Sequence, residues 1–272
     1  MPLSRQAMNI FSGIFKLVKT LPQKPAIILC QAIVLSYLII KKIYRAEIKT
    51  NYQKIFGFYP NGFWIKQGLR IGKNIALMLH LAKTDKILDK TQIYGENILC
   101  RLMENNQKAV IVSFHYGFWE LLPQIFQKLG YETLISIGAQ RDRNLAYEIN
   151  EVRNQNGVKT VATIKEMKEI LQSNGSSNRR QLLGFVLDNT SKTRGIKLNE
   201  PWTGFTVLRT PFVLAKSTKT PVLSMFCYRQ NDKTIVDIDE IQQPQEIGTR
   251  LRSYIEKNPA EWIFWGKIEK KN

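Results

Sequence analysis

The pattern of hydrophobic and polar positions divides the chain into two parts. Over roughly the first 85 residues, apolar residues recur at helical spacing with lysines between them, as in the stretch from Ile10 to Lys19. Breaks at Leu21-Pro22 and at Gly57 to Pro60 interrupt this pattern. We therefore expect a region of short helices at residues 1–85, followed by a separate α/β domain at residues 86–272.

The second part alternates short apolar runs with helical patterns. The runs are partly β-branched or aromatic and predict buried strands at residues 109–114, 133–137, 182–187 and 221–228. Helical patterns are found at 143–155 and 164–172, and the tail from 244 to 265 reads as helical with a break at Asn258-Pro259. The alternating stretch 234–238 predicts an edge strand. Together these patterns indicate a mixed, mostly parallel central sheet flanked by helices.

Charge changes the picture of the first part. The 272-residue chain has a globular composition, 44% hydrophobic and 23% charged, but a formal net charge of +18. Residues 1–84 contain 13 Lys and Arg and one acid, Glu47, so two thirds of the excess charge lies there. A chain this basic is expected to meet a polyanion, either nucleic acid, an anionic lipid surface or an acidic protein.

The segment Ala26–Ile40 favours the lipid surface. Its 15 residues are apolar except for Gln31 and Ser36, and lysines bracket it on both sides. A helix of this length spans roughly 22 Å, short of the ~30 Å hydrocarbon core. We expect it to half-insert or form a hairpin rather than to span, and the flanking lysines favour the cytoplasmic side. The alternative is a buried helix of a soluble domain. Nucleic acid lacks support, because there is no recognition module and no basic stripe interleaved with aromatic residues.

The sharpest candidate for chemistry is the stretch from Ala109 to Pro123. His115 follows a predicted buried strand, at the carboxyl edge where open α/β sheets place their active sites. If Glu120 lies in the first turn of the following helix, its carboxylate can hold one ring nitrogen and raise the basicity of the other, as a general base requires. On spacing alone, the alternative is a histidine that only caps a helix.

The similarity of this stretch to a known family motif extends well beyond these two residues. His115-Tyr-Gly-Phe-Trp-Glu120 resembles the His-x-Gly-Asn-Trp-Glu block of the lipid A biosynthesis (lauroyl/myristoyl) acyltransferase family, within the His-x4-Asp/Glu glycerolipid-type acyltransferases. Further stretches resemble that family's blocks in the same order: Leu21-Pro22 with Asn51, Gln140 to Asn144 with Arg153 and Gly157, Phe185 to Asn189, Trp202 to Gly204, Thr210-Pro211, and Ile255 to Trp262. The resemblance covers nearly the whole chain and favours a catalytic His115.

The chain also departs from the family pattern. Phe118 replaces the usual Asn, Asn189 replaces Gln, and Trp202-Thr203 replaces Phe-Phe. The Arg-Arg-Trp stretch common near the family's C-terminus is absent, with Gly266-Lys267-Ile268 in that region. The resemblance leaves the core chemistry intact and puts the contacts to the acceptor in question.

The resemblance implies transfer of a fatty acyl chain from an acyl thioester to a glycolipid hydroxyl at the cytoplasmic side of the inner membrane. His115 would deprotonate the hydroxyl and Glu120 would steady the imidazolium. An acidic acyl carrier protein is the expected donor because the chain is so basic, with acyl-CoA as the alternative. A non-catalytic protein that binds lipid or acyl carrier on the same fold remains a second reading.

Four further residues are candidates for substrate binding. Arg153 is the first candidate for the donor phosphate or the oxyanion, against a plain surface cation. Asp188 follows a predicted strand and would orient His115, an arginine or the acceptor, unless it only initiates a turn. Arg141, next to Arg143, is weaker because adjacent charges usually form a solvated face. Arg209 precedes a predicted helix start, where a phosphate can bind.

The remaining motifs point away from cofactors. The chain has no G-x-G-x-x-G, no P-loop, no H-E-x-x-H and no C-x-x-C, so we expect no cofactor and no metal. His80 lies in an apolar stretch and is expected to be structural, as are Trp119 and Trp262. The three cysteines stand apart from the histidines and are expected to be inert.

Overall fold

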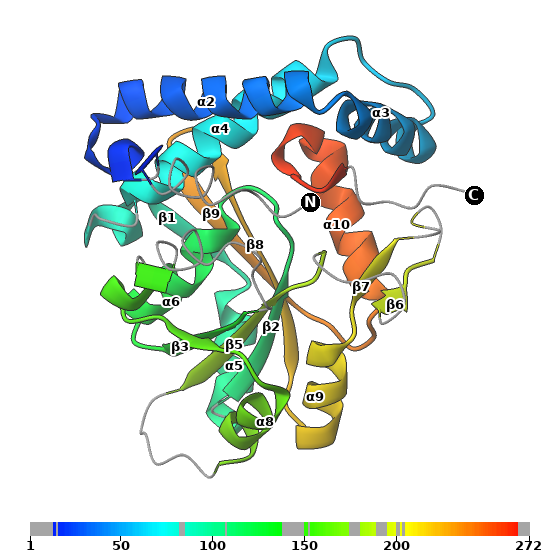
Figure 1. The fold of residues 1–272 in the computed structure, drawn as a ribbon. Helices are drawn as coiled ribbons and strands as arrows, with labels where there is room; N and C mark the ends of the chain where they lie inside the picture. The colour runs from blue at the N-terminus through cyan, green and yellow to red at the C-terminus, as the bar shows by residue number, and fades with distance from the viewer. Residues whose placement is uncertain are drawn as a thin grey trace.

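The sheet dominates the fold. A computed structural model of the chain describes residues 13–14, 16–81, 85–106, 108–137, 150–151, 153–173, 180–188, 195–199, 202 and 205–265. Seven strands form one sheet in the order β1-β9-β8-β2-β5-β3-β4 (Figure 1). All neighbouring pairs are parallel except β8 and β9, so the predicted mostly parallel α/β class is confirmed.

The strands of this sheet lie at the centre of the molecule, and the apolar runs of the sequence form four of them. Their bounds are β1 Thr91–Tyr94, β2 Lys108–Ser113, β3 Glu132–Ser136, β4 Lys159–Val161, β5 Gln181–Val186, β8 Val222–Gln230 and β9 Lys233–Glu240. Every residue of β2 is buried, as expected for a central parallel strand. A separate antiparallel pair is formed by β6 Gly195–Lys197 and β7 Thr206–Leu208.

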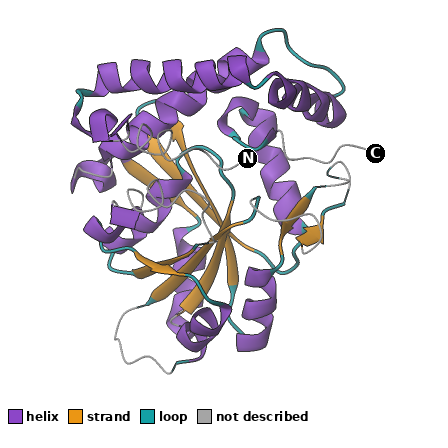
Figure 2. Cartoon of the chain, in the orientation of Figure 1, coloured by secondary structure: helices purple, strands orange, loops and turns teal. Residues whose placement is uncertain are grey.

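Helices cover both faces of this sheet (Figure 2). Alternate residues of β2 pack into two different hydrophobic clusters. Val110 and Val112 lie in the cluster that includes residues of α8, α9 and α10, whereas Ala109 and Ile111 lie in the one that includes residues of α5 and α6. These helices are α5 Glu96–Asn106, α6 Leu122–Lys128, α8 Ile164–Gln172, α9 Thr210–Thr218 and α10 Glu246–Lys257.

Three helices from the first part of the chain form a layer across one end of the molecule. They are α2 Gln23–Ile40, α3 Lys42–Phe56 and α4 Phe63–Leu81. α2 and α4 lie side by side and run antiparallel (Figure 1). Their backbones approach closely because α4 presents glycines. A Cβ on Gly72 would lie 2.5 Å from the Cα of Gln31, and one on Gly68 would lie 2.8 Å from the Leu35 side chain.

Some boundaries differ from the prediction for identifiable reasons. The stretch 234–238 was expected at an edge, but β9 lies between β1 and β8, so the edge assignment is wrong. The edge belongs to β1, which is only four residues long. The helix expected near Gly117 begins later, as the 3₁₀ turn η2 at Trp119–Leu121. The helical tail and its break are confirmed by α10 and the 3₁₀ turn η3, Pro259–Glu261. Most of the expected helix at 143–155 lies outside the described residues.

Candidate active site

Two neighbouring strands bring the first pair of functional side chains together. β2 and β5 are parallel, and Ser113 at the end of β2 is the register partner of Val186 at the end of β5. His115 and Asp188 each follow two residues after these positions. Because parallel strands end at the same edge of a sheet, the two side chains meet there.

The Asp188 carboxylate holds the His115 imidazole. Its Oδ1 lies 2.6 Å from Nδ1 of the ring, and its Oδ2 accepts the backbone N–H of His115 at 3.1 Å. The Asp188 side chain is fully buried, while that of His115 is 20% exposed. A carboxylate at Nδ1 fixes the neutral ring with its proton on that nitrogen and leaves Nε2 with a lone pair. This is the arrangement of a general base.

Glu120 has a different partner from the one its spacing suggests. Its carboxylate accepts two hydrogen bonds from Arg153, from Nε at 2.5 Å and from Nη2 at 3.1 Å. Nη1 of Arg153 donates to the side-chain oxygen of Asn150 at 3.2 Å. The sequence led us to expect that the Glu120 carboxylate holds a ring nitrogen of His115. In the structure, Asp188 holds Nδ1 instead, and Glu120 pairs with Arg153. The reason is the 3₁₀ turn η2, which places Glu120 beside Arg153.

The loop between His115 and Glu120 has a conformation that only glycine accommodates at one position. Gly117 has a φ of 59°, and a Cβ there would lie 2.4 Å from the carbonyl oxygen of Cys227. The close approach lets Phe118 donate its N–H to that oxygen at 2.6 Å, while the N–H of Gly117 donates to the carbonyl of Glu261 at 3.1 Å. The loop is thereby held between β8 and the C-terminal segment.

An apolar pocket lies between α6 and the sheet, next to Glu120 and Arg153, which are among its lining residues. Its polar lining residues are Ser113, Glu120, Thr133 and Arg153, and the rest of the lining is mainly aliphatic and aromatic. Trp119 also lines the pocket, and its ring centroid lies 5.2 Å from that of His115. The geometry thus places a basic histidine, an arginine–glutamate pair and an apolar cavity side by side.

Comparison with known proteins identifies the family of the chain that carries this site. The family model described as bacterial lipid A biosynthesis acyltransferase matches residues 4–265. The chain belongs to this family. A search of curated proteins found no match. The protein is therefore an acyltransferase, and its family indicates acyl transfer in lipid A biosynthesis, with an acyl donor and a lipid A-type acceptor. Family members are membrane-associated.

The other predicted residues of this acyltransferase lie apart from the pocket or outside the described part. Arg141 and Arg143 fall outside the described residues. Arg209 is exposed just before α9 and does not line the pocket, although the N–H of Leu208 donates to the carbonyl of Leu187, next to Asp188. His80 lies near the end of α4, half-buried.

The cysteines of the acyltransferase have the character expected from the sequence in two cases. Burial raises the pKa of the Cys30 thiol to about 11 and raises that of Cys227 further. Both therefore remain neutral thiols near pH 7 and are poor nucleophiles. Among the described residues, no group of three or more His, Cys, Asp or Glu side chains is arranged to hold a metal ion.

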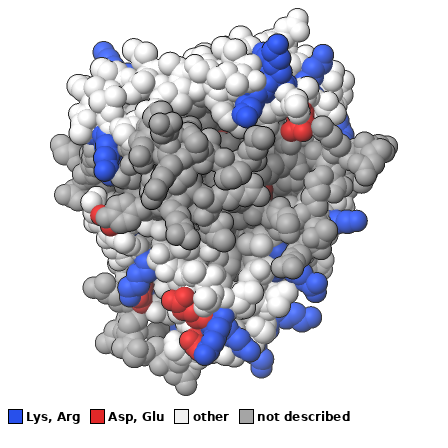
Figure 3. Space-filling view, in the orientation of Figure 1, with Lys and Arg blue, Asp and Glu red and all other residues white. Residues whose placement is uncertain are grey.

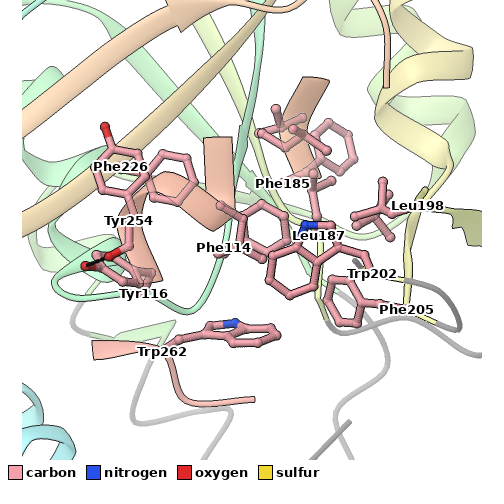
Figure 4. Packing of buried hydrophobic residues seen from close by; sticks show 14 of the residues in the cluster. Phe114, Tyr116, Phe185, Leu187, Leu198, Trp202, Phe205, Phe226, Tyr254 and Trp262 are labelled. Atoms are coloured by element: carbon pink, nitrogen blue, oxygen red, sulfur yellow. Dashed lines mark hydrogen bonds between the residues drawn. The ribbon is translucent and has the colours of Figure 1, made fainter. Parts of the chain in front are cut away.

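Sequence reasoning missed two residues that contact the His115–Asp188 pair. Trp262 packs in the core as expected, against Trp202 and Phe205 (Figure 4), but its indole N–H also donates to Oδ2 of Asp188 at 2.9 Å. Phe264 packs edge-on against the His115 ring, with centroids 4.5 Å apart. No spacing could have shown these contacts, because both residues lie far along the chain in a segment without regular structure.

Proposed function

We propose that this acyltransferase moves a fatty acyl chain from an acyl thioester, carried by an acyl carrier protein, to a hydroxyl of a lipid A-type glycolipid at the cytoplasmic face of the inner membrane. One observation carries the chemistry: the Nδ1 of His115 is held by the buried Asp188 carboxylate beside an apolar pocket. A neutral imidazole with a free Nε2 lone pair is ready to accept a proton from a hydroxyl.

The proposed reaction needs no covalent enzyme intermediate. Nε2 of His115 takes the acceptor's hydroxyl proton as the oxygen attacks the thioester carbonyl, and the new C–O bond gives a tetrahedral oxyanion. The C–S bond then breaks, and the departing thiolate takes the proton from the imidazolium. Asp188 stabilises the imidazolium throughout, in the place where the sequence had suggested Glu120.

Arg153 is proposed to stabilise negative charge at the pocket. Its side chain is 10% exposed and is held by two hydrogen bonds to Glu120, so its position is fixed before substrate binds. A guanidinium fixed in this way is suited to a developing oxyanion or to the donor's phosphate. Glu120 then acts through Arg153, by orienting it.

Replacing Glu120 with glutamine is expected to lower acyl transfer by about tenfold to a hundredfold, less than the loss of a general base. The amide removes the charge that holds Arg153 and presents an N–H₂ group to a guanidinium that can only donate. Initial rates of transfer measure this. The matched control is Glu256→Gln, which breaks an exposed pair with Arg252 at 2.6 Å and should leave the rate unchanged. Equal rates for Glu120→Gln and wild type would contradict the assignment.

The apolar pocket is proposed to take the acyl chain. Its lining side chains come mainly from the sheet and from α6, and most of them are apolar, as in sites that bind apolar ligands. Gly184 on β5 leaves part of this lining without a side chain, since a Cβ there would meet only the carbonyl oxygen of Leu134, at 3.6 Å. A chain in this pocket would hold its thioester near Glu120 and Arg153.

The helical layer is proposed to lie on the membrane surface rather than to cross it. α2 is the one helix, among the described residues, that is long and apolar enough to span. Yet it packs closely along α4 through Gly68 and Gly72, so it is part of the fold. The layer exposes large apolar side chains, including Ile28 and Ile40 on α2 and Ile43 on α3. Figure 3 shows this end of the molecule as largely uncharged, with Lys and Arg around it.

We expect replacement of Ile28, Ile40 and Ile43 by serine to weaken binding to vesicles containing anionic lipid at least about tenfold, because each buried isoleucine contributes roughly 1.5–3 kcal/mol. These side chains are 67%, 74% and 72% exposed, so the fold should tolerate the change. Vesicle sedimentation measures the effect. Ile164→Ser, at a residue 61% exposed on α8, is the control and should bind normally. Recovery of the wild-type protein in the soluble fraction at low salt would contradict the proposal.

The function as a whole is tested by lipid mass spectrometry of cells with and without the gene, since a lost acyl group identifies both the chain and its acceptor. Transfer from purified acyl carrier protein and acyl-CoA thioesters, compared across ionic strength, then identifies the donor. Faster transfer from the carrier protein that weakens with salt is expected, because the chain carries a net charge of +18. A clear preference for acyl-CoA would overturn the donor. Absence of transfer and hydrolysis with both would favour a non-catalytic binding protein.

A further inference from the structure

Three N–H groups from two residues, His115 and Trp262, face the Asp188 carboxylate. Oδ1 lies against Nδ1 of the His115 ring, whereas Oδ2 accepts both the backbone N–H of His115 and the indole N–H of Trp262. Trp262 is fully buried, so its indole has no access to water as an alternative acceptor. The contact is therefore a built part of the site.

We propose that Trp262 is a positioning residue for the general base. The inference rests on the proposed role of His115 and goes beyond it, because it assigns to Trp262 the task of fixing the rotation of Asp188. The torsion that turns a carboxylate about its Cβ–Cγ bond is broad and soft. A donor from Trp262 on Oδ2, added to the backbone donor, keeps Oδ1 aimed at Nδ1.

The segment that carries Trp262 is itself held from both sides. Towards the loop of residues 115–120, the N–H of Ile263 donates to the carbonyl of His115 at 3.1 Å, and the N–H of Gly117 donates to the carbonyl of Glu261. Towards the helical layer, three side chains donate to carbonyl oxygens of the segment: Tyr44 to Ile263 at 2.9 Å, Asn51 to Trp265 at 2.5 Å, and Gln67 to Trp262 at 2.9 Å. The side chain of Asn74 on α4 also bonds the buried Glu261 carboxylate.

These contacts give the indole little freedom to move. Its ring packs against Trp202 at 5.8 Å, Phe205 at 5.5 Å and Trp265 at 5.1 Å, measured between centroids. Figure 4 shows the Trp262 ring at the lower edge of this cluster, below Phe114 and beside Phe205. Because backbone and ring are both fixed, the N–H is placed before any substrate arrives, which is what a positioning residue requires.

The chain offers matched controls for a test. Trp265 and Trp202 are also buried, and each donates its indole N–H to a backbone carbonyl, of Pro259 at 2.8 Å and of Gly248 at 3.0 Å. Tryptophan to phenylalanine at any of the three positions removes one N–H and a similar volume. Only at position 262 does the lost donor face the Asp188 carboxylate.

The experiment uses the full-length protein in lipid, with its histidines labelled with ¹⁵N. The chain has two histidines, so a His80→Gln protein assigns the His115 signals. In the wild type we expect a protonated Nδ1 whose proton exchanges slowly, and an unprotonated Nε2. Trp262→Phe should speed that exchange and populate the other tautomer. It should also lower kcat about 10- to 100-fold with the donor KM within about twofold. Trp265→Phe and Trp202→Phe should keep the wild-type spectrum.

Two results would overturn the proposal: a wild-type His115 spectrum and kcat in folded Trp262→Phe, or the same losses in the two control variants. If Trp262→Phe does not fold, 3-benzothienylalanine at position 262 replaces it, since this analogue keeps the shape of tryptophan and carries sulfur in place of the N–H. The spectrum needs no substrate. A change in the spectrum without acyl transfer by the wild type would thus contradict the proposed function while supporting the role of Trp262.

Discussion

His115→Ala should lower acyl transfer by at least about 10²–10⁴-fold, the loss typical of a general base. The change removes the imidazole that Asp188 holds and that is proposed to take the proton of the lipid hydroxyl. It leaves the buried strand β2 untouched. Rates of transfer from a purified acyl thioester to a lipid A-type acceptor measure this, with vesicle binding and thermal unfolding to show that the protein is intact.

His80→Ala is the matched control, because His80 is the other histidine of the chain and lies on α4, away from the sheet edge. It should transfer acyl groups at close to the wild-type rate. A folded, membrane-bound His115→Ala protein that works as fast as the wild type would remove His115 from the mechanism.

Asp188→Asn should be comparably damaging, with an expected loss of about 10³–10⁴-fold, as in serine-protease triads, where the same change reverses the histidine tautomer. The orientation of the new amide follows from its neighbours. Two N–H groups, from the His115 backbone and from Trp262, face one oxygen position. The amide oxygen must therefore lie there, and its N–H₂ must face Nδ1 of His115. The proton then moves to Nε2, where the acceptor's hydroxyl needs a lone pair.

The ¹⁵N spectrum of the His115 ring shows this reversal directly, alongside the transfer rate. Asp239→Asn is the control, since Asp239 is 46% exposed and pairs with Arg250 at 3.1 Å, away from the histidine. Because residues that act as a unit are non-additive, His115→Ala combined with Asp188→Asn should cost little more than His115→Ala alone. Normal transfer by Asp188→Asn would show that the carboxylate does not set the tautomer.

Four strands, β2, β3, β5 and β8, were predictable because each is a continuous apolar run, but their neighbours in the sheet were not. The sequence places both His115 and Asp188 just after a predicted strand. It does not show that β2 pairs with β5 with Ser113 opposite Val186, and this pairing alone brings the two side chains within 2.6 Å. The order of strands in a sheet depends on packing over the whole domain, which local patterns do not report.

Local spacing also favoured the wrong partner for Glu120. It assumed a regular helix from near Gly117, whereas close contact with the Cys227 carbonyl delays the helix and leaves Glu120 in a 3₁₀ turn facing Arg153. The edge assignment of residues 234–238 failed for a related reason, since a strand of four residues, β1, covers β9 and gives too short a signal to recognise. The division at residue 85 and the binding roles of Arg141 and Arg209 remain predictions.

The segment around Trp262 has a consequence for how the enzyme is made. The helices that hold it emerge from the ribosome before it does, since the donors Tyr44, Asn51 and Gln67 bond residues about 200 positions later. Trp262 is synthesised 74 residues after Asp188, so the Asp188 carboxylate gains its third donor only once this later segment has emerged. Since chains fold from the N-terminus during synthesis, the nascent protein would possess a membrane-facing layer well before it possesses an ordered base. Translation order would thus let the proposed membrane contact form before the active site is complete.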